Sequence, residues 1–182
     1  MRKTVLILGI CCLLAAPAWA GGGFSLFGSY SEVSDEGQSF GAGARISFGD
    51  ARWVGDLTWT WYERADDIVI LTDPLIEDDL QIIPTDLGVR YIIPTQGSFQ
   101  PYIGGGFTYF YANLNHGRAE NSLGGYVLAG FNLGKSGTKF FGEVLYRMGE
   151  SNMSYEPTPG SIIKEKVDVG GIGVNVGLVW TF

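Results

Sequence analysis

The last stretch of the chain, residues 170–182, alternates between two kinds of side chain. Large apolar side chains take every second position and end on a C-terminal aromatic: Ile172, Val174, Val176, Leu178, Trp180 and Phe182. The positions between them are small or polar, except for Val179. A period of two predicts a β-strand. An apolar face opposite a small or polar one is typical of a strand that faces lipid outside and lines a narrow barrel inside.

The N-terminus has the pattern of an export signal. Two basic residues precede an apolar run over residues 5–16, and the small-x-small site Ala18-Trp19-Ala20 follows. We therefore expect residues 1–20 to be a signal peptide cleaved after Ala20, which leaves residues 21–182 as one domain. The apolar run is shorter than the roughly 20 residues of a spanning helix, which disfavours a membrane anchor.

Two adjacent cysteines raise lipid attachment as an alternative. Ile10 precedes Cys11 at the place where lipoprotein signals have a small residue, so a lipoprotein is the minor interpretation. Cys11 and Cys12 are the only cysteines of the sequence. Cleavage after Ala20 would therefore leave no thiol for a disulfide or a thiolate metal site.

The charge balance argues against a nucleic-acid partner. Loss of Arg2 and Lys3 with the signal reduces the 12 basic residues to 10, against 19 acidic ones, a net charge of −9. The basic residues are scattered singly and form no positive stripe. Residues 21–182 also contain no apolar run near the length of a transmembrane helix. With 46% hydrophobic and 17% charged residues, this exported chain must cover its apolar surface in another way.

Period-two patterns predict eight strands, an even number as in single-chain bacterial barrels. They cover residues 24–31, 39–48, 53–63, 80–93, 100–113, 122–133, 139–149 and 167–182. Long loops are expected at residues 32–38, 64–79, 116–121 and 150–166, and short turns after the even-numbered strands. The alternation of long loops and short turns predicts an all-β, eight-stranded antiparallel up-and-down transmembrane β-barrel over residues 21–182. The short turns and both termini are expected in the periplasm.

Two details test this fold. A soluble eight-stranded barrel of the lipocalin type is the alternative, but its apolar face would point inward. The membrane barrel instead requires Trp59, Trp61, Phe107 and Tyr109 to share one outer face. Pro84 and Pro101 are expected near strand ends or bulges, because proline has no N–H for a sheet ladder.

Three motifs carry a resemblance to a known family. They are QPYIGGG at residues 100–106, LGVRY at 87–91 and GEVLYR at 142–147, together with the terminal Phe182. They resemble the small outer-membrane β-barrel family that includes OmpW-like proteins and the OmpA- and OmpX-type eight-stranded barrels. The likeness covers the last five predicted strands.

The resemblance implies a location and partners. It implies a porin-like barrel in the outer membrane of a Gram-negative cell envelope, surrounded by lipid and lipopolysaccharide. In the family the barrel-assembly machinery recognises the C-terminal aromatic strand, a role that would fall on Trp180 and Phe182. Some OmpW-like members carry small hydrophobic molecules, so passage or binding of such molecules is an alternative function.

Strand parity directs six charged side chains into the lumen, three of each sign: Arg45, Asp56, Asp86, Arg90, Glu143 and Arg147. Four of them lie at one depth near the periplasm, and Asp86 and Arg147 lie higher. Side chains fill the lumen of an eight-stranded barrel, where buried charges require partners. We therefore predict an ion-pair cluster that plugs the lower lumen, with a gated polar pore as the alternative.

The second long loop is rich in carboxylates: Asp66, Asp67, Asp73, Glu77, Asp78 and Asp79. Oxygen ligands suit calcium and magnesium, so these acids could bridge a divalent cation to lipopolysaccharide phosphates. The loop lacks the ordered spacing of a calcium-binding loop, and a solvated acidic loop is the simpler interpretation. We expect no dedicated metal site or cofactor.

An enzyme is the rival class, because some barrels of this size modify lipid A. The only histidine, His116, lies in an expected external loop without a neighbouring serine, and no nucleophile elbow or paired-histidine motif occurs. The sequence therefore favours a non-enzymatic, monomeric barrel with a structural or surface-interaction role.

Overall fold

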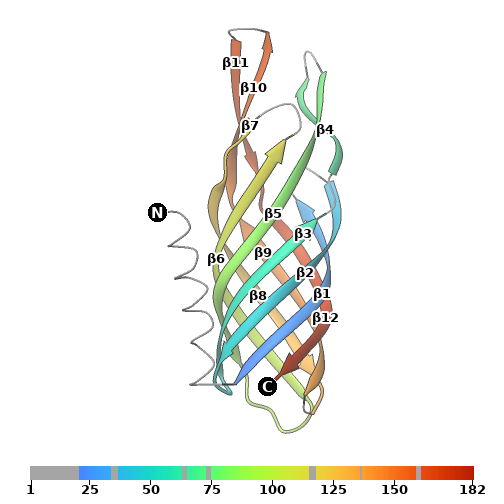
Figure 1. The fold of residues 1–182 in the computed structure, drawn as a ribbon, viewed down its shortest axis with the longest axis vertical. Helices are drawn as coiled ribbons and strands as arrows, with labels where there is room; N and C mark the ends of the chain where they lie inside the picture. Colours follow the sequence, from blue (N-terminus) through green and yellow to red (C-terminus); the bar gives the residue numbers. More distant parts are fainter. Residues whose placement is uncertain are drawn as a thin grey trace.

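Eight antiparallel strands close into a barrel (Figure 1). The computed structural model describes residues 21–33, 37–62, 65–72, 75–114, 118–135, 137–158 and 161–182. The barrel strands are β1 (Gly22–Val33), β2 (Gly37–Gly49), β3 (Trp53–Tyr62), β5 (Leu75–Ile92), β6 (Phe99–Leu114), β8 (Ser122–Leu133), β9 (Thr138–Met148) and β12 (Gly171–Thr181). Each strand pairs with the next, and β12 pairs with β1 to close the ring. The predicted fold class is confirmed.

The two faces of the wall differ in the way that the alternation predicts. Trp61 and Phe107 on the outer face are 62% and 66% exposed, and the apolar side chains of β12 from Ile172 to Trp180 also point outward. The inner face buries polar groups such as Asn175 and Thr108. An apolar exterior around a polar interior is the reverse of a soluble barrel and suits a lipid surrounding. Among the described residues no helix has the length and apolarity to cross a membrane.

The short turns, the start of β1 at Gly22 and the C-terminus lie at the same end of the barrel (Figure 1). The turn between β8 and β9 includes Gly137 at φ +67°, a conformation that a residue with a Cβ rarely adopts. Gly22 and Phe182 exchange two backbone hydrogen bonds of 2.9 Å, so the ladder of β1 and β12 continues to the C-terminal residue. Residues 1–20 lie outside the described part of the chain, and the cleaved signal stays a prediction.

The expected long loops carry strands at the opposite end, which corrects the predicted boundaries. Strand β4 (Ala65–Thr72) and the first part of β5 form a hairpin where a loop over residues 64–79 was expected. Strands β10 (Glu150–Thr158) and β11 (Ser161–Asp168) form a second hairpin, and the short β7 (Arg118–Ala119) joins its edge. Residues 68–71, Ile-Val-Ile-Leu, have a strong strand propensity that the flanking acids obscured.

Of the two prolines expected near strand ends or bulges, Pro101 lies close to the start of β6, but Pro84 lies inside the long strand β5, away from both of its ends. It marks the place where β5 changes partner. The ladder between β3 and β5 stops at the pair Trp59 and Thr85, and the ladder between β4 and β5 starts at Ala65 and Leu80. Pro84 still has a register partner on β6. A proline inside a strand is therefore accommodated beside an interruption of the wall.

Candidate functional site in the barrel interior

The barrel interior contains three buried ion pairs formed by the six charged residues that parity directs inward. The pairs are Arg45 with Glu143, Arg90 with Asp56, and Arg147 with Asp86. Every one of these residues is at most 5% exposed. Six charges of balanced sign are thus removed from water, which is tolerable only with partners and additional hydrogen bonds.

The pair of Arg45 and Glu143 crosses the lumen from β2 to β9. Arg45 Nη1 donates to Glu143 Oε2 at 3.0 Å, Nη2 donates to Oε1, and Nε donates to Thr58 Oγ1 at 3.0 Å. The guanidinium carbon lies 5.7 Å and 5.4 Å from the ring centroids of Phe27 and Phe141. The forked geometry and the two rings fix this arginine in one orientation.

Glu143 has more partners than its ion pair. Its Oε2 accepts a hydrogen bond from the Tyr102 hydroxyl at 2.8 Å, and its Oε1 accepts one from Asn175 Nδ2 at 2.8 Å. A Cβ on Gly130 would lie 2.7 Å from both the Glu143 Cβ and the Tyr102 ring. The glycine therefore makes room for this carboxylate and its tyrosine, and it explains one of the small residues on the inner face.

Arg90 and Asp56 pair across the neighbouring strands β5 and β3. Arg90 Nη2 donates to Asp56 Oδ1 at 2.8 Å, and Nε donates to Oδ2. Ser47 Oγ donates to Asp56 Oδ1 at 2.7 Å and also lies 3.2 Å from Arg90 Nη2. The Tyr102 ring lies 4.8 Å from the Arg90 guanidinium carbon, so Tyr102 contacts both lower ion pairs.

The third pair forms a separate cluster. Arg147 Nη2 donates to Asp86 Oδ2 at 2.7 Å, and Nε lies 3.2 Å from Oδ1. Thr108 Oγ1 donates to Asp86 Oδ1 at 2.8 Å, and Arg147 Nη1 donates to the Tyr62 hydroxyl at 3.2 Å. The Tyr62 hydroxyl is also hydrogen bonded to Ser29 Oγ at 2.9 Å. These contacts join β1, β3, β5, β6 and β9 through polar groups.

The sequence analysis did not identify the uncharged side chains that hydrogen bond to the six charged residues. Parity places Ser47, Thr58, Thr108 and Asn175 on the inner face, and this is the signal that could have identified them. Their partners depend on how far one strand is shifted along the next around the ring. A single sequence contains little information about that shift.

Among the described residues there is no group of three His, Cys, Asp or Glu side chains arranged to hold a metal ion. His116 lies outside the described residues, and the enzyme hypothesis that depended on it gains no support. The side chains of Asp66, Asp67, Asp73, Glu77, Asp78 and Asp79 also lie outside the described part, so the calcium hypothesis stays untested.

The two residues expected to carry the assembly signal lie at the closing seam. Trp180 stacks on Phe24 of β1, with ring centroids 6.1 Å apart, and the Phe182 side chain is 79% exposed. The exposed Phe182 side chain beside the seam is accessible for the predicted recognition by the assembly machinery. That recognition stays a prediction.

The fold and its two faces define a class of protein, the eight-stranded barrel of the outer-membrane type. No protein family and no curated protein matches the sequence. The structure is similar to that of the outer membrane protein OprG from Pseudomonas aeruginosa, with a TM-score of 0.71, 16% identity and coverage of 89% of this chain and 95% of that chain.

Two other solved structures have the same architecture. Outer membrane protein AlkL in DMPC lipid bilayers gives a TM-score of 0.64 at 16% identity, covering 89% of this chain and 90% of that chain. Neisserial surface protein A gives 0.60 at 15% identity, covering 89% and 96%. At these identities the likeness shows the fold. The predicted small outer-membrane β-barrel is confirmed at that level.

Proposed function

We propose that the protein is a non-enzymatic outer-membrane barrel with a closed lumen, which anchors and displays its external hairpins. The observation that supports this most is the burial of all six interior charges in three ion pairs. Burial of the rings of Tyr62, Tyr102 and Phe141 in the same interior also supports a lumen filled by side chains. The closed barrel is then a stable support.

The external end supports the display role. The hairpin of β4 with β5 and the hairpin of β10 with β11 rise beyond the barrel at the end opposite the short turns and the C-terminus (Figure 1). Strand pairing gives these hairpins more order than an open loop has. Ordered external elements on a membrane-anchored barrel are suited to contact other molecules of the envelope or surroundings.

A planar-bilayer recording tests the closed lumen. The wild-type protein is expected to remain at the conductance of the bare membrane. The double variant Arg45→Ala/Glu143→Ala removes the pair that crosses the lumen without changing the net charge, and it is expected to give small stepwise currents. The double variant Glu150→Ala/Lys166→Ala removes an exposed pair outside the lumen and is the control. A stable, large conductance of the wild type would contradict the proposal.

A second candidate function is sideways passage of small apolar molecules between the lumen and the membrane. The interruption of the wall beside Pro84 favours it, because no ladder joins β5 to the last residues of β3 there. Thr60 and Tyr62 belong to these last residues of β3 and are buried, so side chains cover the interruption. Opening it requires movement of side chains and breaks no ladder hydrogen bond.

Substitution of Pro84 tests whether small apolar molecules pass sideways through the wall. Pro84→Val supplies an N–H that can extend the ladder, and it is expected to slow the entry of the apolar dye N-phenyl-1-naphthylamine into cells that carry the barrel. Pro101→Val is the matched control, because the ladder with β8 continues through Pro101. Equal dye entry for the wild type, both variants and cells without the barrel would exclude sideways passage.

A further inference from the structure

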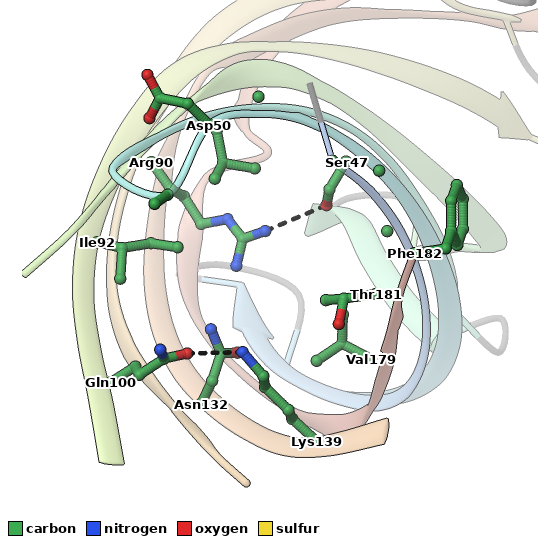
Figure 2. Close-up of a pocket in the computed structure, with 16 residues that line it drawn as sticks. Ser47, Asp50, Arg90, Ile92, Gln100, Asn132, Lys139, Val179, Thr181 and Phe182 are labelled. Carbon is green, nitrogen blue, oxygen red and sulfur yellow. Dashed lines mark hydrogen bonds between the residues drawn. The ribbon is translucent and has the colours of Figure 1, made fainter. Parts of the chain in front are cut away.

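The end of the barrel with the short turns, which we expect to face the periplasm, is hollowed into a cup of about 350 Å³ (Figure 2). Its floor is Arg90, whose guanidinium points to the middle of the cup and is hydrogen bonded to Ser47 in Figure 2. Arg90 belongs to one of the ion pairs of the lower lumen, so this ionic cluster lies at the inner end of the cup. A concavity of this volume falls within the range of small-molecule sites.

One wall of the cup is polar. Lys139 Nζ donates to Gln100 Oε1 at 2.8 Å, and Asn132 lies beside them in Figure 2. Apolar side chains also line the cup, with Val54, Ile92 and Val179 among them, beside the polar Ser47 and Thr181. A cup that offers both polar and apolar surface is complementary to a molecule with one polar head and a short hydrocarbon tail.

The charges around the cup leave one cation uncompensated. Arg90 is neutralised by Asp56. Asp50 points away from the middle of the cup in Figure 2, and its carboxylate accepts the backbone N–H groups of Trp53 and Arg52, which hold its pKa below the usual range. Among the described lining residues, Lys139 is the cation without a carboxylate partner.

Gly21 and Phe182 line the rim of the cup, where Gly22 and Phe182 exchange two backbone hydrogen bonds. The side-chain charge that a ligand meets on the polar wall is that of Lys139.

We propose that this cup binds a small organic monocarboxylate from the periplasmic side. The carboxylate accepts hydrogen bonds from Lys139 Nζ and from the amide groups of Gln100 and Asn132. The aliphatic tail packs on Val54, Ile92 and Val179. This inference goes beyond the proposed function, because a closed lumen needs no ligand and a ligand in the cup need not cross the barrel.

Hexanoate is the probe, titrated against the protein in phosphatidylcholine nanodiscs and followed by NMR. We expect saturable shifts in the signals of the lining residues. Lys139→Gln is expected to weaken binding by about tenfold or more, the effect of losing a charge-assisted hydrogen bond. Lys135→Gln removes an exposed cation in the adjacent turn and is the matched control, with unchanged affinity.

Hexanol separates recognition of the head from partition into the bilayer. It has the same tail without the charge, and it is expected to bind about tenfold more weakly than hexanoate or not at all. Shifts that do not saturate, equal affinities for hexanol and hexanoate, or full affinity in Lys139→Gln would each overturn the proposal. Because bilayer currents play no part in this experiment, its outcome is independent of the test of the closed lumen.

Discussion

Replacing Glu143 with glutamine is expected to lower the free energy of unfolding by about 3–5 kcal/mol, the cost of leaving a buried charge without its partner. Arg45 would remain in the lumen at 3% exposure, with its guanidinium between two aromatic rings and no carboxylate to neutralise it. The measurement is urea-induced unfolding of the barrel in lipid vesicles, followed by tryptophan fluorescence.

A matched control makes the result specific to burial. Glu150 also pairs with a cation, Lys166, but both side chains are at least 60% exposed. Glu150→Gln is therefore expected to cost less than about 1 kcal/mol. Equal effects of the two glutamine substitutions would mean that water reaches the interior pair, and the closed lumen would have to be abandoned.

A double variant separates the pair from its surroundings. Arg45→Met/Glu143→Met removes both charges and keeps most of the volume, so its loss of stability is expected to be smaller than that of Glu143→Gln. Some loss remains, because the Tyr102 hydroxyl and Asn175 would no longer have the carboxylate that they contact.

The fold could be predicted because one physical requirement repeats in every strand. A strand in the barrel wall has an outer face in lipid and an inner face in a narrow lumen, and the period-two pattern records both. The predicted membrane-exposed face, with Trp61 and Phe107, is the exposed face in the structure. Beyond the barrel wall this requirement ends. Strands β4, β10 and β11 lie at the end opposite the short turns, and the pattern did not predict them.

The sequence predicted which charged side chains point into the lumen, but not which contacts they make there. Parity alone directs Arg45 and Glu143 inward, but they belong to β2 and β9, which have β1 and β12 between them in the sheet. Their contact depends on the diameter of the ring and on the stagger of its strands. For the same reason the sequence indicated no role for Asn175, a side chain that only the closed barrel brings to Glu143.

Replacing Val144 with arginine is expected to destabilise the barrel by about 2–4 kcal/mol in vesicles, the cost of an arginine on the lipid face near the bilayer midplane. Val144 is on the outer face near the middle of β9, next to Glu143 on the inner face. Its register partners are Val174 on β12 and Ala129 on β8, so the surrounding wall offers no carboxylate to pair with the new charge.

Met148→Arg is the control on the same strand and the same face. Met148 is the last residue of β9, at the outer end, and is 47% exposed. An arginine there can reach the interface, so the expected cost is about 0–1 kcal/mol. Urea titration of both variants in vesicles gives the comparison. A large difference follows only if the middle of this face is surrounded by hydrocarbon, because water would solvate both arginines alike. Equal stabilities would therefore contradict the membrane-spanning orientation on which the closed lumen and the periplasmic cup both depend.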